Sequence, residues 1–145
     1  MIVSAGNLEM DACNISPGNS PGAIVVGASR VRRPVVGDDT MVDERAPGTA
    51  FGACIDVFAP GDSVLLPSMD GQRRASEQLW TGTSMAAGYV SGAIALYLEA
   101  HPFATTDAIY QHIQTTASRV TRVDARSPRA GMLYVGPATM LLAQR

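Results

Sequence analysis

The chain has 145 residues, of which 46% are apolar and 17% charged, and its formal net charge is −2. This composition is typical of a single globular domain and excludes disordered and membrane-like classes. The small net charge argues against nucleic acid or anionic lipid as a main partner. No apolar stretch reaches the roughly 18 residues needed to cross a bilayer.

Two short apolar runs near the N-terminus predict buried strands. Residues 2–5 read as the end of one strand, which Gly6 and Asn7 stop. Turn-forming residues from 14 to 22 predict an ordered loop. Residues 23–28 then form a continuous apolar run with β-branched members, which is typical of a strand covered on both faces.

The middle of the chain carries fewer signals of regular structure. Residues 30–53 are polar and rich in Gly, Pro and Asp, which predicts a long surface loop. A short basic run in this loop is expected to be solvated rather than a binding patch: Arg30, Arg32 and Arg33. Residues 55–59 predict a further short strand, ended by Pro60-Gly61. A variable polar stretch then continues to Gln78.

Helical patterns dominate the C-terminal part. Residues 84–100 predict a helix with little charge, so we expect it to be buried almost all round, with Gly88 and Gly92 allowing close backbone approach. A second helix is expected from Thr105 or Thr106, either of which can cap it. A last helix is expected after Gly136-Pro137. Strands alternating with helices predict a layered α/β fold.

Ser84 stands where the first helix begins, directly after Gly82 and Thr83. The free backbone N–H groups of a first helical turn offer donors to a developing oxyanion, and the helix dipole favours negative charge there. Ser84 is therefore a candidate nucleophile. The alternative is that Ser84 or Thr83 merely caps the helix, as Ser and Thr often do.

Four sequence blocks together resemble the subtilisin-like (S8) serine peptidases, in particular the proteinase K and proprotein-convertase-9-like branch. In family order, the blocks are Ser4-Ala5-Gly6-Asn7, residues 14–28, residues 55–61 and Gly82-Thr83-Ser84-Met85-Ala86. The resemblance implies a partial subtilisin-like three-layer α/β fold with a mostly parallel sheet and a buried central helix that starts at Ser84. It also implies that residues 1–145 form the C-terminal portion of a peptidase domain.

The resemblance implies a role for each matching residue. Ser84 matches the nucleophile that attacks a peptide carbonyl and forms an acyl-enzyme. The side-chain amide of Asn7, together with the backbone N–H of Ser84, would bind the oxyanion. Ser4, Ala5 and Gly6 match a wall of the S1 pocket. The family further implies a polypeptide substrate and a secreted protein, although the chain opens without a signal peptide.

The catalytic partners of the serine are not found in this sequence. The family places its Asp and His ahead of the oxyanion Asn, whereas this chain begins six residues before Asn7. Both histidines, His101 and His112, follow Ser84 and are expected to be structural. Without a general base the hydroxyl stays a weak nucleophile, so the chain alone is expected to be inactive. The implied partner is a missing N-terminal half that carries Asp and His.

Two other functions stay open at this point. The chain could be a catalytically inactive truncated homologue that at most binds a peptide or a partner. It could also be an α/β-hydrolase, whose nucleophile elbow is Gly-x-Ser-x-Gly and whose His follows the Ser. The hydrolase hypothesis leaves three of the four blocks unexplained.

The cysteines and one carboxylate add two expectations. From the residues alone, Cys13 and Cys54 could form a disulfide or be two buried thiols. The resemblance implies a Cys13–Cys54 disulfide. It also implies a structural Ca²⁺ held by carbonyl oxygens of Pro21 and Ala23 and by the Asp56 carboxylate, with water completing the shell. The alternative is that Asp56 is a hydrogen-bonded strand residue. No cofactor is expected to be required for the reaction.

Overall fold

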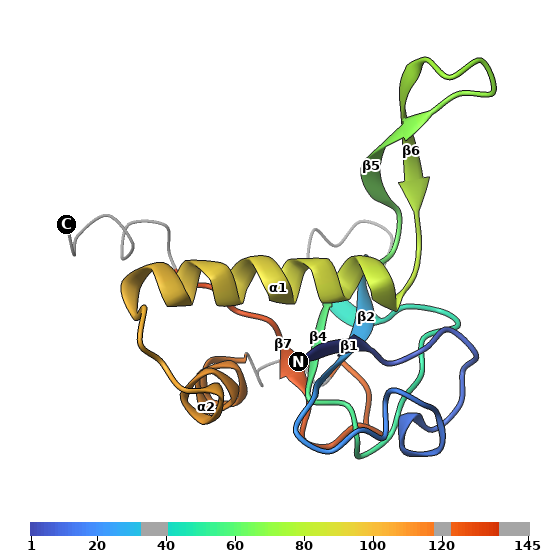
Figure 1. The fold of residues 1–145 in the computed structure, drawn as a ribbon. Helices are drawn as coiled ribbons and strands as arrows, with labels where there is room; N and C mark the ends of the chain where they lie inside the picture. Colours follow the sequence, from blue (N-terminus) through green and yellow to red (C-terminus); the bar gives the residue numbers. More distant parts are fainter. Residues whose placement is uncertain (33–40, 118–122, 137–145) are drawn as a thin grey trace.

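The computed structural model describes residues 1–32, 41–117 and 123–136. Its centre is a sheet whose strands are β1 (Ile2–Ser4), β2 (Ile24–Arg32), β3 (Val42–Arg45), β4 (Val57–Pro60) and β7 (Gly131–Met132). Strands β1, β2, β4 and β7 are parallel in this order, and β3 pairs antiparallel with β2 (Figure 1). The expected α/β fold with a mostly parallel sheet is confirmed.

The sheet separates two hydrophobic clusters because successive residues of a strand point to opposite faces. On β2, Val26 belongs to the cluster beneath the helices and Val25 to the cluster beneath the loops. On β4, Val57 and Phe58 divide in the same way. The continuous apolar run of β2 therefore reflects a strand that is covered on both sides, as its composition predicts.

Two helices, α1 (Thr83–Ala100) and α2 (Thr106–Thr116), cover one face of the sheet. Helix α2 begins as expected, with the Thr105 side-chain oxygen accepting a hydrogen bond of 3.2 Å from the Ala108 N–H. Its Ile113 is 2% exposed, and Gln114 donates a side-chain hydrogen bond of 2.9 Å to the Asp56 carbonyl oxygen. Apolar packing and this hydrogen bond together hold α2 against the sheet.

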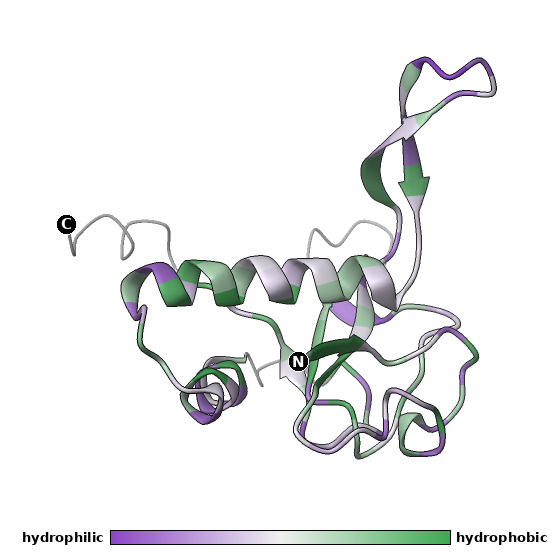
Figure 2. Ribbon diagram, in the orientation of Figure 1, coloured by the Kyte–Doolittle hydropathy of each residue, from purple (hydrophilic) through white to green (hydrophobic). Residues whose placement is uncertain are grey.

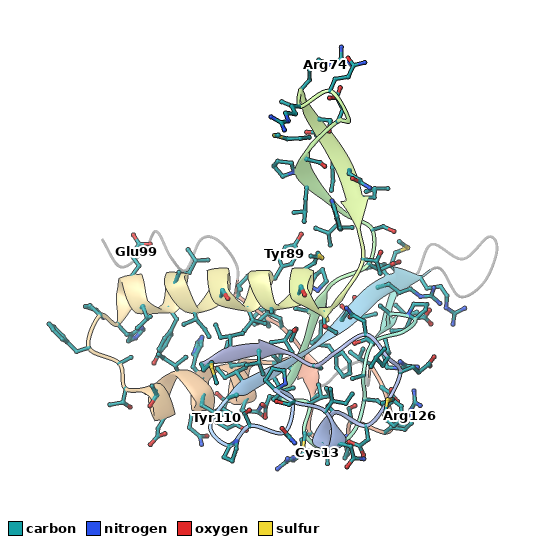
Figure 3. The ribbon with its side chains drawn as sticks, turned by 45° about the vertical axis from the view of Figure 1, so that its right-hand side comes forward. Cys13, Arg74, Tyr89, Glu99, Tyr110 and Arg126 are labelled. Carbon is teal, nitrogen blue, oxygen red and sulfur yellow. A yellow bond between two sulfur atoms is a disulfide. The ribbon has the colours of Figure 1, made fainter. Side chains whose placement is uncertain are left out.

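Helix α1 is buried on one side only, so the expectation that it is buried almost all round is wrong for the described part of the chain. It starts at Thr83, one residue before the expected position. Tyr89 is 47% exposed and lies on the outward side of the helix (Figure 3). A Cβ added at Gly88 or Gly92 would meet no other atom within 4 Å. The reason is that no described segment covers this side.

The predicted loop over residues 30–53 contains regular structure that the sequence did not indicate. Strand β2 continues to Arg32 and pairs with β3. The Nε atoms of Arg30 and Arg32 each donate a hydrogen bond of 2.7 Å to a different carboxylate oxygen of Glu44. Both arginines thus pair across the strands. Arg33 lies outside the described residues.

The predicted polar stretch before Gln78 also contains structure. Strands β5 (Val64–Met69) and β6 (Ala75–Trp80) form an antiparallel hairpin that stands away from the sheet and helices (Figure 1). Figure 2 shows hydrophilic residues at its tip. There the Asp70 carboxylate accepts hydrogen bonds of 2.8 Å from the N–H groups of Gln72 and Arg74.

The described C-terminal part contains strand β7, which has two residues. Beyond it, the Leu133 N–H still donates a hydrogen bond of 2.7 Å to the Phe58 carbonyl oxygen. The helix expected after Gly136 lies outside the described residues. Among the residues that the structure describes, no helix is both long and apolar enough to span a membrane.

Candidate active site

The turn after β1 brings Asn7 to the start of α1. Ala5 is fully buried, and its N–H donates a hydrogen bond of 3.0 Å to the Val26 carbonyl oxygen. Gly6 follows with φ +107°, a backbone conformation that side chains disfavour, and its N–H donates to Thr83 Oγ1 at 3.2 Å. The segment that carries Asn7 is therefore fixed to both the sheet and the helix.

The Asn7 side chain caps α1 from a distant part of the sequence. Its Oδ1 accepts a hydrogen bond of 2.9 Å from the Thr83 N–H and another of 3.0 Å from the Thr83 hydroxyl. The N-cap residue itself is Gly82, which has no side chain. Because Asn7 provides this cap, neither Ser84 nor Thr83 serves as the cap that the alternative interpretation assigns to them.

Capping fixes the amide of Asn7 in one orientation. With Oδ1 held by Thr83, the other end of the amide, Nδ2, lies against Gly82, at 3.2 Å from where a Cβ would stand. Nδ2 has no hydrogen-bond partner within residues 1–32, 41–117 and 123–136. A donor with a fixed direction and no partner is what an oxyanion site requires.

Ser84 is the second residue of α1 and is exposed. The Thr83 N–H is bound by Asn7, and the Met85 N–H donates to the Gly82 carbonyl oxygen at 3.1 Å. Ser84 lies between these two residues, and neither its N–H nor its hydroxyl has a hydrogen-bond partner in the described chain. The Asn7 amide and Ser84 thus both lie at the first turn of α1, the positive end of the helix dipole.

Ser4, Ala5 and Gly6, the residues expected to form a wall of the S1 pocket, run directly into this site. Ser4 pairs with Val26 as the last residue of β1, and the Gly6 carbonyl oxygen accepts a hydrogen bond of 2.8 Å from the Ala50 N–H. The structure thus places all three residues in one fixed segment beside Asn7. Their contact with a substrate stays a prediction.

The two histidines lie at the opposite end of α1. The ring centroid of Tyr97 is 4.5 Å from that of His101 and 4.1 Å from that of His112, and all three rings are stacked. Burial, followed by the nearby charge of His101, lowers the pKa of His112. His101 follows the last residue of α1, about 25 Å along the helix from Ser84 at 1.5 Å per residue. Both imidazoles pack the helix junction and neither reaches Ser84.

A disulfide between Cys13 and Cys54 is present, as the resemblance implies. Cys13 lies in the short helix η1 (Ala12–Asn14), and its N–H donates a hydrogen bond of 2.9 Å to the Asp11 carboxylate. The two Cα atoms are 5.2 Å apart (Cys13 is labelled in Figure 3). The bond joins the segment that follows Asn7 to the loop that precedes β4.

The expected calcium ligands Pro21, Ala23 and Asp56 line one pocket of about 560 Å³. Asp56 is 8% exposed, and its two carboxylate oxygens each accept a hydrogen bond of 2.8 Å, from the Val25 N–H and the Tyr110 hydroxyl. Burial, and then the bond to Asp56, raise the pKa of Tyr110.

These residues would give a Ca²⁺ only part of its coordination shell. The ion takes six to eight oxygen ligands, and one already hydrogen-bonded carboxylate with two carbonyl groups supplies a minority of them, so water would have to provide the rest. Within the part of the chain that the structure describes, no group of three or more His, Cys, Asp or Glu side chains could hold a metal ion.

Sequence reasoning missed the part that Thr83 plays in this site. It treated Thr83 as one letter of a motif or as a possible cap, whereas the structure shows it bound to both Gly6 and Asn7. Its fully buried side chain provides the contact that fixes the Asn7 amide. The only available signal was its position between Gly82 and Ser84.

Comparison with known proteins places this geometry in context. The model of the peptidase S8 "Subtilase family" matches residues 1–132. The chain is 35% identical over 113 residues to proprotein convertase subtilisin/kexin type 9 of Rattus norvegicus, covering 78% of this chain and 15% of that protein. It is 38% identical over 109 residues to an extracellular serine proteinase of a Thermus species, covering 75% and 24%.

A solved protease from Pseudoalteromonas arctica has a similar structure, with a TM-score of 0.78 and 28% identity over 98% of this chain and 42% of that one. The chain therefore spans less than half the length of each of these three proteins.

Proposed function

The chain belongs to the subtilase family, and on that premise we propose that it supplies the nucleophile and the oxyanion site of a secreted serine endopeptidase. Ser84 Oγ attacks the scissile carbonyl and forms an acyl-enzyme. The Asn7 Nδ2 and the Ser84 N–H donate to the carbonyl oxygen as it becomes negative. A general base that residues outside this chain supply takes the proton of Ser84 and gives it to the amine, which leaves as the peptide C–N bond breaks. Water then hydrolyses the acyl-enzyme, which releases the carboxylic acid and restores the Ser84 hydroxyl.

The observation that carries this proposal is the contact between Asn7 and Thr83. Residues 76 positions apart in the sequence are joined by two hydrogen bonds of 2.9 and 3.0 Å, and the nucleophile candidate is the next residue. A purely structural cap needs only the oxygen of the amide. The asparagine also provides an N–H₂ group, which lies against Gly82 at the start of α1, and an oxyanion would make use of that group.

The proposed substrate is a polypeptide, whose residue on the acyl side of the scissile bond would lie against Ser4, Ala5 and Gly6. Small side chains and a glycine leave room there for a sizeable side chain. The name of the Thermus relative, an extracellular serine proteinase, supports both the chemistry and the secreted location. The disulfide fits an oxidising compartment.

A second candidate function is a catalytically inactive homologue that binds a peptide or a protein partner. The position of His101 and His112, stacked on Tyr97 at the far end of α1, favours it for the chain by itself. The two functions differ in what happens when an Asp and a His are supplied.

The test is a chimera in which residues 1–132 replace the matching part of the Thermus proteinase. The chimera should hydrolyse a peptide substrate, and Ser84→Ala should lower kcat by roughly 10⁴-fold or more. Asn7→Ala should lower it by about 10²–10³-fold, because one oxyanion donor is lost.

Ser91→Ala is the matched control, since Ser91 is an exposed serine of α1 whose hydroxyl donates to the Ala87 carbonyl oxygen. It should leave the rate unchanged. A folded chimera without Ser84-dependent hydrolysis would exclude the peptidase and leave the binding function.

A structural calcium ion at Pro21, Ala23 and Asp56 is part of the proposal. Binding to the folded state alone would raise the melting temperature with increasing CaCl₂, and Asp56→Asn would remove that dependence. The same melting temperature in CaCl₂ and in EDTA would exclude the ion.

A further inference from the structure

Arg45, the last residue of β3, joins three segments of the chain beneath the turn that carries Asn7. Its Nη1 donates to the Thr49 carbonyl oxygen at 2.6 Å, and its Nη2 donates to Glu9 Oε1 at 2.6 Å. Its Nε lies 2.8 Å from Asp124 Oδ2. The side chain is only 14% exposed. All three nitrogen atoms of the guanidinium are therefore engaged.

Two of these segments are joined by backbone hydrogen bonds: residues 6–9, which include Asn7, and residues 48–50. The Ala50 N–H donates to the Gly6 carbonyl oxygen, and the Glu9 N–H donates to the Gly48 carbonyl oxygen, both at 2.8 Å. Asn7 lies between Gly6 and Glu9. Residues 48–50 thus fix the backbone immediately before and after Asn7.

The same turn is also held by the Phe51 N–H, which donates a hydrogen bond of 3.0 Å to the Met10 carbonyl oxygen. Residues 7–10 are exposed, and Glu9 has φ +52°, which is uncommon for a residue with a side chain. The hydrogen bond from Arg45, and then its charge, lower the pKa of Glu9, so this carboxylate is ionised at neutral pH. A charge-assisted bond to a planar guanidinium is stronger and more directional than a neutral one.

The third segment fixes the guanidinium in turn. Asp124, whose side chain is 9% exposed, binds Arg45 and also Arg126, and the Arg126 guanidinium lies 3.8 Å from the ring centroid of Phe51 (Arg126 is labelled in Figure 3). The Arg45 side chain is therefore also supported by Asp124, and this contact does not involve Glu9 or Thr49.

We propose that Arg45 is a positioning residue for the oxyanion site, because it fixes the turn of Asn7 against Thr83 through Glu9 and the Thr49 carbonyl group. Its effect on peptide hydrolysis rests on the proposed function. Its effect on the geometry does not, because the Asn7–Thr83 hydrogen bond can be measured in the chain alone.

The amide hydrogen of Thr83 reports that bond directly, since Asn7 Oδ1 is its acceptor. In Arg45→Met, hydrogen exchange of the Thr83 amide, followed by NMR, should become about tenfold faster. The Asp56 N–H, which donates to the Val25 carbonyl oxygen at 2.9 Å inside the sheet, should keep its rate. Arg45→Lys should restore part of the protection.

Arg74→Met is the matched control, because Arg74 is an exposed arginine at the tip of hairpin β5–β6 whose ion pair is with Asp70, so Arg45 and its partners stay untouched. It should not change the exchange of Thr83. Glu9→Gln is a milder change, at the hydrogen-bond partner of Arg45. It should also accelerate hydrogen exchange of the Thr83 amide, and it serves as the test if Arg45→Met does not fold.

The positioning role would be overturned if hydrogen exchange became equally faster at the Thr83 and Asp56 amides. It would also be overturned if a folded Arg45→Met variant showed unchanged exchange at Thr83. Neither result depends on whether the assembled enzyme cleaves peptides. An inactive chimera with a protected Thr83 amide would instead overturn the proposed function.

Discussion

The two sides of α1 have similar composition and opposite surroundings. On the sheet side, Ala86, Val90 and Ile94 are at most 8% exposed. On the outward side, Tyr89 and Leu96 are 47% and 40% exposed and border an apolar groove of about 630 Å³ next to β5. The difference shows that apolar composition predicts which residues can be buried, whereas burial itself depends on which segments lie against them.

The largest difference in stability between the two sides of α1 is expected when one side chain on each side is truncated. Ile94→Ala should lower the free energy of unfolding by about 2–5 kcal/mol, because it leaves a cavity against the sheet. Leu96→Ala should cost less than about 1 kcal/mol. Urea denaturation of both variants measures the difference. Equal losses would mean that the outward side is covered in solution.

A smaller effect on stability is expected at the first turn of α1. Asn7→Ala removes the cap of Thr83 and should cost about 0.5–2 kcal/mol. Asn7→Asp keeps the accepting oxygen and adds a negative charge near the helix N-terminus, so thermal unfolding should show little or no loss.

In the active chimera, however, Asn7→Asp should lower kcat about as much as Asn7→Ala, because both remove the donor. If Asn7→Asp kept the rate, the Nδ2 group would have no role in hydrolysis.

Glycine on the outward side should respond in the opposite direction. Gly88→Ala has open space for the new methyl group and should stabilise the helix by about 0.5–1 kcal/mol. Gly27→Ala is the comparison, because there the Phe58 ring occupies the place of a Cβ and the variant should be destabilised. Differential scanning calorimetry decides the sign. A destabilised Gly88→Ala would show that another backbone packs at Gly88.

The smallest expected effect is a dependence on pH at the other end of α1. Burial, followed by His101, holds the pKa of His112 below its ordinary value of 6.5. Below pH 6.5 the unfolded chain therefore binds a proton more readily than the folded chain, so stability is complete above this pH and falls as the pH drops.

The variant His112→Phe keeps a ring against Tyr97 and cannot titrate. Its melting temperature should fall less between pH 7 and pH 5 than that of the unchanged protein. Equal slopes would assign the pH dependence to other groups.

The elements that are predicted well from the sequence are those whose buried faces pack against other parts of this chain, or whose ends carry a local signal. Residues 23–28 read as a doubly covered strand because both faces of β2 pack within this chain. Thr105 identifies the start of α2 because a cap is a local signal. The disulfide followed from the family resemblance, since the spacing of Cys13 and Cys54 carries no geometry by itself.

The elements that were missed lack a buried face or depend on distant contacts. Hairpin β5–β6 has solvent on both sides and a proline, Pro67, in its first strand, although Asp70-Gly71 is a turn signal that could have indicated it. Strand β3 is held by arginine–glutamate ion pairs, and its polar, charged sequence resembles that of a loop. In the candidate site, Ser84 and Asn7 are predictions from the sequence, whereas the contact between Thr83 and Asn7 joins distant parts of the sequence and is seen only in the folded chain.

The tip of hairpin β5–β6 has a consequence for handling the protein. Residues 70–74 connect the two strands in a loop that stands away from the sheet (Figure 1), and Arg73 is exposed in this loop. Trypsin would cut after this residue and leave both cysteines in the first fragment. The two fragments would then be held together by non-covalent contacts, among them the pairing of β4 with β7, the Asn7–Thr83 hydrogen bonds and the Arg45–Asp124 ion pair. They would separate in denaturant without any reducing agent.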